Sequence, residues 1–207
     1  MWDWELLKNR TSNGHSEILA QFGNEDFRYT HAVSHGSSED EYCLHNHAMY
    51  ELVYCVGGEA VFLADGVRYQ MRPGSLLIIT PTVPHKLFLR EETPFERHIL
   101  YVYSTGNASE LSRLMGEGRL ADQSMGSAYY EDVQRVDADF DRISETSRSS
   151  DETIRGLTPL FVRAFAADLL ITMRQRDPLR FSVGVSRKID SILLYLNQHF
   201  TADLTLQ

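Results

Sequence analysis

Cysteine and long hydrophobic runs are scarce in this sequence of 207 residues. Its two cysteines, Cys43 and Cys55, are too few for a disulfide scaffold, and we expect both to remain thiols. The first residues, Met1 to Glu5, lack the basic and apolar parts of an export signal, and no segment approaches membrane-spanning length. These absences exclude a disulfide-rich secreted domain and predict a cytoplasmic protein with no membrane partner.

The sequence is also short of positive charge. It has 20 Lys and Arg residues against 29 Asp and Glu residues, a formal net charge of −9. Nucleic-acid binding needs basic side chains that neutralise phosphates, so we do not expect this chain itself to bind DNA. Its hydrophobic content of 43% is sufficient for one large domain, or one domain with an appendage.

The first half of the sequence predicts β-structure. Short runs of β-forming residues alternate with turn signals such as Gly57-Gly58, Asp65-Gly66 and Pro73-Gly74. Many short strands joined by tight turns favour a barrel or a sandwich. The expected strands cover residues 27–33, 50–56, 60–63, 76–79, 86–89 and 98–103.

Three histidines and one glutamate form the candidate site. His45 and His47 point to the same face of an extended strand, and Glu51 keeps their parity if the strand continues. His85 would then join them from a distant strand after several turns. Imidazoles and a carboxylate suit zinc, nickel, iron or manganese, so a divalent metal is feasible although none is required. The alternatives are an effector pocket without metal and structural hydrogen bonding.

This pattern resembles the cupin family of small β-barrels, in which a first motif of His-x-His, Glu and Gly is followed by a second motif with Pro-x-Gly and His. His45, His47, Glu51 and Gly58 match the first motif in type and spacing. In the second motif, Pro73-Gly74 and His85 keep the order and depart from the spacing. The resemblance implies a cupin-like jelly-roll barrel.

The second half of the sequence changes to a helical period. One narrow apolar seam is expected on a helix running from Tyr129 through Phe140 to Ile143. A second helix, from Glu152 to Arg176, carries a wider apolar surface and ends before Pro178. One partner cannot bury all of that surface, so we expect either a homodimer or complete coverage by the barrel and the preceding helix. The candidate interface residues are Leu157, Leu160, Phe161, Ala164 and Phe165.

A further unit begins near the end of the sequence. Residues 178–185 are expected to form a linker, after which Ser186 can cap a helix with apolar positions from Ile189 to Phe200. A barrel with His-x-His, two helices, a linker and this last helix, in this order, resembles the AraC-type transcription regulators. The order of these pieces is more specific than any one of them.

The resemblance implies a division of the chain and a role for each part. Residues 1–106 would be the effector-binding barrel with an N-terminal arm, residues 107–177 a helical dimerisation region, and residues 186–207 the start of a truncated helix-turn-helix domain. The expected fold class is mainly β with C-terminal helices. The effector would be a small polar molecule, such as a sugar, and DNA would be bound through the missing C-terminal domain.

The rival interpretation is a metal-dependent cupin enzyme, a dioxygenase, oxidase or isomerase, that uses the same four residues to hold iron or manganese. The long helical extension and the further unit at Ser186 favour a regulator, so we expect no enzymatic activity. Other aromatic and histidine side chains of the β-region are additional candidates for the pocket wall, namely Tyr29, His31, Tyr54, Tyr69, His98 and Tyr101.

Overall fold

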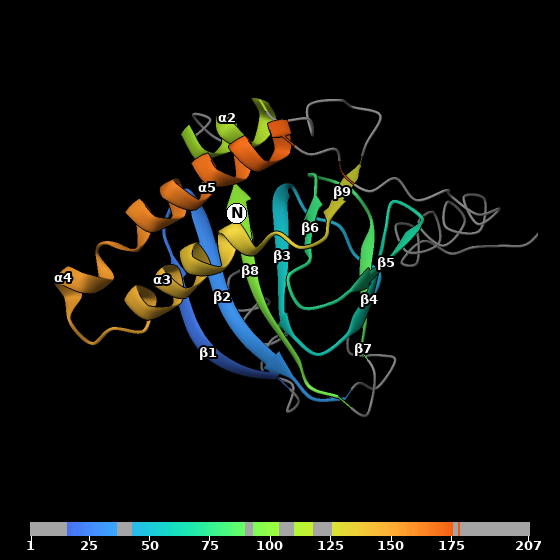
Figure 1. Cartoon of the computed structure of the whole chain (residues 1–207), viewed down its shortest axis with the longest axis horizontal. Helices are drawn as coiled ribbons and strands as arrows, with labels where there is room; N and C mark the ends of the chain where they lie inside the picture. The colour runs from blue at the N-terminus through green and yellow to red at the C-terminus, as the bar shows by residue number, and fades with distance from the viewer. Residues whose placement is uncertain are drawn as a thin grey trace, which may run out of the picture.

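The structure is a computed structural model that describes residues 16–36, 43–89, 93–103, 110–117, 126–175 and 178. Two antiparallel sheets face one another, and helices cover the outer side of the larger sheet (Figure 1). The larger sheet has six strands in the order β1-β2-β8-β3-β6-β9, and the smaller has the order β5-β4-β7. The expected fold class, mainly β with C-terminal helices, is confirmed.

The elements of the chain follow one another in this sequence. The strands are β1 (Ser16–Gly23), β2 (Phe27–Ser34), β3 (Met49–Gly57), β4 (Ala60–Ala64), β5 (Val67–Met71), β6 (Leu76–Ile79), β7 (His85–Leu89), β8 (Phe95–Tyr103) and β9 (Ser127–Tyr130). The helices are α2 (Glu110–Glu117), α3 (Asp137–Ser147), α4 (Glu152–Arg155) and α5 (Thr158–Gln175), with a 3₁₀ turn over Gln134–Val136.

The two faces of the large sheet belong to different cores. Leu52, Leu100 and Val102 lie on the outer face and pack with buried residues of α3 and α5. Val53 and Phe95, whose strand parity is opposite, lie on the inner face and pack with the small sheet. We call the surface that the large sheet turns toward the small sheet the inner face.

Tight turns of the predicted kind join the strands. Gly58 follows β3 with φ of +76°, a conformation that residues with side chains rarely adopt. A side chain at this position would also overlap the backbone carbonyl of Pro94. The predicted Gly58 turn is therefore fixed both by backbone conformation and by close packing.

Three strands were not predicted from the sequence. Strand β1 pairs with β2, and β5 pairs with β4. Strand β9 pairs with β6 and so extends the large sheet beyond residue 106, into the region expected to be helical. These strands are short or have mixed burial, and therefore lack a clear alternation of polar and apolar residues.

The expected helix from Tyr129 to Ile143 is wrong in its first half. Tyr129 lies in β9, and α3 begins only at Asp137. Phe140 and Ile143 are buried as expected. The apolar spacing is real, but its first members belong to a strand and a turn, where the amide of Val133 donates to the carbonyl of Gly74.

The expected helix from Glu152 to Arg176 is divided at Gly156 into α4 and α5. Together the segment Glu152–Gln175 has 24 residues and is long and apolar enough to cross a membrane, which corrects the expectation that no segment reaches that length. Helices that form the core of a domain meet the same criterion. In this structure α5 buries Val162, Phe165 and Leu169 against the large sheet and α3.

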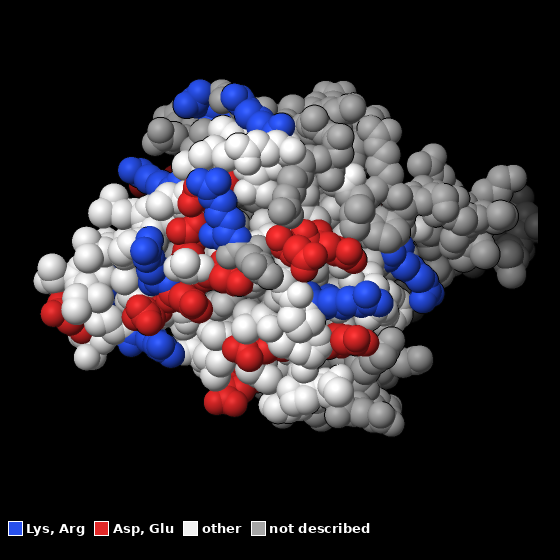
Figure 2. Space-filling model, viewed as in Figure 1, with Lys and Arg blue, Asp and Glu red and all other residues white. Residues whose placement is uncertain are grey.

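Among the described residues on the face shown in Figure 2, basic and acidic side chains are interspersed. The N-terminal arm, the linker over 179–185 and the expected helix after Ser186 lie outside the described residues.

Candidate metal and effector site

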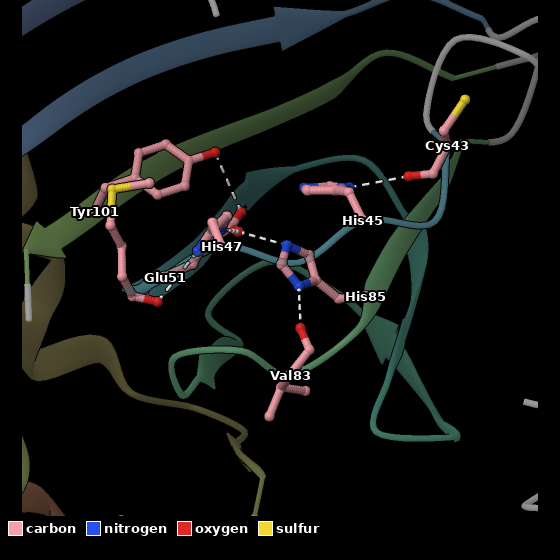
Figure 3. A network of polar contacts seen from close by, with 8 residues as sticks. Cys43, His45, His47, Glu51, Val83, His85 and Tyr101 are labelled. Carbon is pink, nitrogen blue, oxygen red and sulfur yellow. Dashed lines mark hydrogen bonds and ion pairs between the residues drawn. The ribbon is translucent and has the colours of Figure 1, made fainter. Parts of the chain in front are cut away.

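Three segments of the chain bring the candidate residues together (Figure 3). His45 and His47 precede β3, Glu51 lies within it, and His85 is the first residue of β7. His45 and His85 face each other across an isolated antiparallel bridge, with backbone hydrogen bonds of 3.0 and 2.8 Å. This bridge holds the segment before β3 against the small sheet.

All four predicted residues converge on one point. Each offers one ligand atom, and these atoms lie within 4.8 Å of one another. Oε2 of Glu51 lies 2.9 Å from Nε2 of His47 and 2.9 Å from Nε2 of His85. Glu51 and His85 are buried, whereas His45 and His47 are half-buried. The cluster is therefore accessible from the side of His45 and His47.

Backbone carbonyls fix the orientation of all three imidazoles. Nδ1 of His45 lies 2.9 Å from the carbonyl oxygen of Cys43, and Nδ1 of His85 lies 2.9 Å from that of Val83. Nδ1 of His47 lies 3.2 Å from the carbonyl oxygen of Met49. A carbonyl only accepts, so Nδ1 carries the proton in each ring. In the neutral rings the lone pair is then on Nε2, the nitrogen that His47 and His85 direct at Glu51.

This arrangement calls for a cation between the side chains. Lone pairs on Nε2 of His47 and His85 would otherwise face the same carboxylate oxygen of Glu51. Protons on the imidazoles or a divalent metal can relieve that repulsion. Three imidazole nitrogens and one carboxylate are a donor set that zinc, nickel, iron and manganese accept, so these residues fit a metal.

The pKa shifts of the cluster residues also favour a cation between these side chains. Burial alone raises the pKa of Glu51, but the charge of His85 and the hydrogen bonds of His47 and His85 together hold it well below its usual value. Burial lowers the pKa of His85, and the carboxylate of Glu51 outweighs burial, so the net shift is upward. Burial and the charge of His85 lower the pKa of His45. The carboxylate stays ionised and attracts cations.

Tyr101 is the one additional aromatic candidate that reaches this cluster. Its hydroxyl lies 3.5 Å from Oε1 of Glu51, and its ring makes an edge contact with His47. Tyr69 instead bonds to Ser127 through its hydroxyl. The other four candidates lie on the outer face beside α3, where strand parity alone could not place them: Tyr29, His31, Tyr54 and His98.

These outer-face residues form a second polar cluster. Nδ1 of His31 lies 3.0 Å from the hydroxyl of Ser144 in α3, and its Nε2 lies 2.8 Å from Oε1 of Glu96. Nδ1 of His98 lies 2.7 Å from the hydroxyl of Tyr29. The cluster joins the large sheet to α3.

The candidate interface residues divide between the surface and the core. Leu157, Leu160 and Ala164 are exposed, and Phe161 is half-buried against the core. Phe165 is fully buried and packs against Phe140 at 4.6 Å between ring centroids, so it does not belong to a free surface. Ala167 and Ile171 are also exposed. The exposed apolar residues therefore form a stripe of Leu157, Leu160, Ala164, Ala167 and Ile171.

Two facing antiparallel sheets, a cluster of three histidines and one glutamate, and covering helices define a ligand-binding domain of the cupin type. The chain belongs to the family of AraC-like ligand binding domains, whose model matches residues 31–157, more than half of the 207 residues. The sequence matches no curated protein.

Solved structures with a similar fold are remote. A putative mannose-6-phosphate isomerase from Ralstonia eutropha is 16% identical, with a TM-score of 0.40 over 45% of this chain and 89% of that one. An RmlC-like cupin from Shewanella frigidimarina is 18% identical, with a TM-score of 0.39 over 44% of this chain and 78% of that one. AerE from Microcystis aeruginosa is 17% identical, with a TM-score of 0.41 over 45% of this chain and 44% of that one.

Proposed function

We propose that this chain is the sensor and dimerisation part of an AraC-type transcriptional regulator that works in the cytoplasm. The observation that carries the proposal is the family match over residues 31–157, which includes the site, the small sheet, most strands of the large sheet and α3. A small polar effector binds between the sheets beside His47, Glu51 and Tyr101. DNA is bound by a C-terminal helix-turn-helix domain of which residues 186–207 form the start.

Regulation requires that the effector bind one state of the protein more tightly than another. Strand β8 is a direct physical connection, because Tyr101 reaches the site while His98 and Leu100 of the same strand pack toward α3. A movement of β8 on effector binding changes the surface on which α3 and α5 rest. Only the large sheet therefore separates the effector from the helices.

A metal fits this function as part of the effector site. His45, His47, Glu51 and His85 would hold it, and the bound ion would supply a Lewis-acidic partner for an oxygen of the effector. His45 and His47 are the half-buried members, so the effector approaches from their side.

Dimerisation uses the exposed stripe that begins at Leu157 and continues along α5. Leu157, Leu160, Ala164, Ala167 and Ile171 recur at steps of three and four, the spacing of a seam between two helices. Leu160 is 57% exposed, and burying it against a second copy removes that apolar area from water. We expect Leu160→Glu to convert a dimer to a monomer in analytical ultracentrifugation. Val56→Glu, also at an exposed apolar position, is the matched control and should remain dimeric.

The coding sequence after codon 207 tests the DNA-binding part of the proposal. Two helix-turn-helix units are expected there, and the whole gene product should retard promoter DNA in a gel-shift assay. A stop codon directly after Gln207 would contradict the regulator.

A metal-dependent cupin enzyme is the second candidate, and the donor set of three histidines and one glutamate favours it. Elemental mass spectrometry distinguishes the two, on protein purified without an affinity metal column and compared with His47→Ala. Stoichiometric iron or manganese that the variant loses, together with oxygen consumption, would support the enzyme. Zinc or nickel would support a metal-dependent sensor, and absence of metal from both proteins would support an effector pocket without metal.

A further inference from the structure

The inner face of the large sheet has an apolar part and a polar part. Next to the small sheet, β3 and β6 are covered by a packed core that includes Val53, Leu77 and Ile79. The neighbouring inner positions of β2 and β8 are polar or incompletely covered. They carry Thr30 and Arg97, which are buried, and Ile99 and Tyr101, which are half-buried.

Arg97 is the unusual residue of this polar part. It is only 5% exposed and has the same strand parity as Phe95 and Tyr101, so its side chain leaves β8 on the inner face. One guanidinium nitrogen donates to the hydroxyl of Ser34 at 2.8 Å, and the guanidinium carbon lies 5.3 Å from the centre of the Phe95 ring. Among the residues that the structure describes, no carboxylate oxygen lies within 4.0 Å of it.

A buried guanidinium without a carboxylate is energetically unfavourable. Removing the charge from water carries a desolvation penalty that one hydroxyl and one aromatic ring only partly offset. The guanidinium has five N–H donors, and the Ser34 hydroxyl accepts from one nitrogen. Arg97 therefore has N–H donors that Ser34 does not use, and among the described residues its positive charge has no carboxylate in direct contact.

Three carboxylates lie in this region. Glu59 and Glu96 act together with Arg97 on the pKa of Cys55, and Glu96 is bonded to His31 at 2.8 Å. Glu51 is already engaged by His47 and His85 at 2.9 Å each. Arg28 pairs with Tyr101 across β2 and β8, and Arg97 lies four residues before Tyr101 on the same face of β8. An anion that enters beside Arg97 meets the positive charge of its guanidinium.

We propose that Arg97 binds the carboxylate of the effector, which is therefore a small organic acid. A planar guanidinium matches a carboxylate by two parallel hydrogen bonds, a geometry that a neutral sugar hydroxyl cannot offer. The polar remainder of the acid lies toward Tyr101 and the histidine cluster. This inference rests on the proposed effector function and specifies the chemical class of the effector.

Sodium acetate, a small carboxylate that has a neutral amide of similar shape, tests the inference on the whole chain. The backbone amide signals of Thr30, Ala32 and Ile99 are followed by nitrogen–proton NMR at constant ionic strength. We expect acetate to shift these signals with saturation and neutral acetamide of similar shape to give no saturable shift. In Arg97→Gln the apparent dissociation constant should rise by about tenfold or more. Arg68→Gln, at an exposed arginine, is the matched control and should bind acetate as the wild type does.

Two results would overturn the inference. One is an equal response to acetate and acetamide in the wild-type protein, which does not depend on whether any variant folds. The other is acetate binding that is unchanged in Arg97→Gln. The readout needs no DNA, so acetate binding by a protein that regulates no promoter refutes only the proposed function. A regulator that ignores acetate refutes only the inference about Arg97.

Discussion

Acid should destabilise this protein through His98. The imidazole is 3% exposed, bonds to the Tyr29 hydroxyl at 2.7 Å and stacks on Phe140 with ring centroids 4.8 Å apart. Burial, and then the charge of the neighbouring His31, lower the pKa of His98 from 6.5 to about 3. The folded protein therefore keeps His98 neutral at pH values at which the unfolded chain is already protonated.

The sign and size of the effect follow from proton linkage. The unfolded state binds an additional proton below pH 6.5, so the free energy of unfolding falls as the pH decreases from about 6.5 to about 3. The loss from this residue is about 1 kcal/mol at pH 5.5 and about 3 kcal/mol at pH 4.5. Above pH 6.5 the contribution is complete and the pH dependence vanishes.

Urea unfolding at pH 7.5, 5.5 and 4.5, with a chelator present so that no metal contributes, measures this loss. His98→Gln keeps a polar partner for Tyr29 and cannot take up the proton, so its stability should fall less between pH 7.5 and 4.5, by about 3 kcal/mol. His35→Gln, at an exposed histidine, is the matched control and should keep the full acid loss. The same acid loss in His98→Gln and wild type would refute the reasoning.

Three further predictions concern packing, backbone conformation and thiol chemistry. Phe165→Ala should lower the free energy of unfolding by about 3–5 kcal/mol because it opens a cavity in the core, whereas Leu160→Ala should change it by less than about 1 kcal/mol in protein dilute enough to be monomeric. Gly58→Ala should cost at least about 2 kcal/mol, since it adds overlap with Pro94 to a positive φ, and Gly36→Ala, with positive φ and open space, should cost about 1 kcal/mol; urea unfolding compares them. Because burial raises the pKa of Cys55 to about 12, a thiol reagent at pH 8 should label the exposed Cys43 and leave Cys55 unmodified until the protein unfolds, which mass spectrometry can follow.

Much of the candidate site was predictable because its residues are close in sequence. His45, His47 and Glu51 share strand parity, and His85 follows after turns that the glycines signal. The structure brings the four together as expected, and their role stays a prediction. The backbone carbonyls that orient the imidazoles, such as that of Val83, leave no mark in the sequence, because every residue has one.

The features that were missed depend on contacts between distant segments. Tyr129 has the spacing of a helix but pairs as a strand with Leu77, because the edge of the large sheet provides backbone partners that local periodicity cannot reveal. Phe165 and Leu160 were equivalent as apolar residues of one helix. Only the position of Phe140 shows which of them is covered.

Successive side chains of β8 point to opposite faces of the large sheet, so this strand contacts both the space between the sheets and the helices. Arg97 and Tyr101 face the space between the sheets, while His98 and Leu100 face the helices. Substitutions that change the space between the sheets and substitutions that change the support of the helices therefore fall on interleaved positions of the same nine residues. The lining of the space between the sheets can change at every second residue of β8 without replacing any side chain that supports the helices.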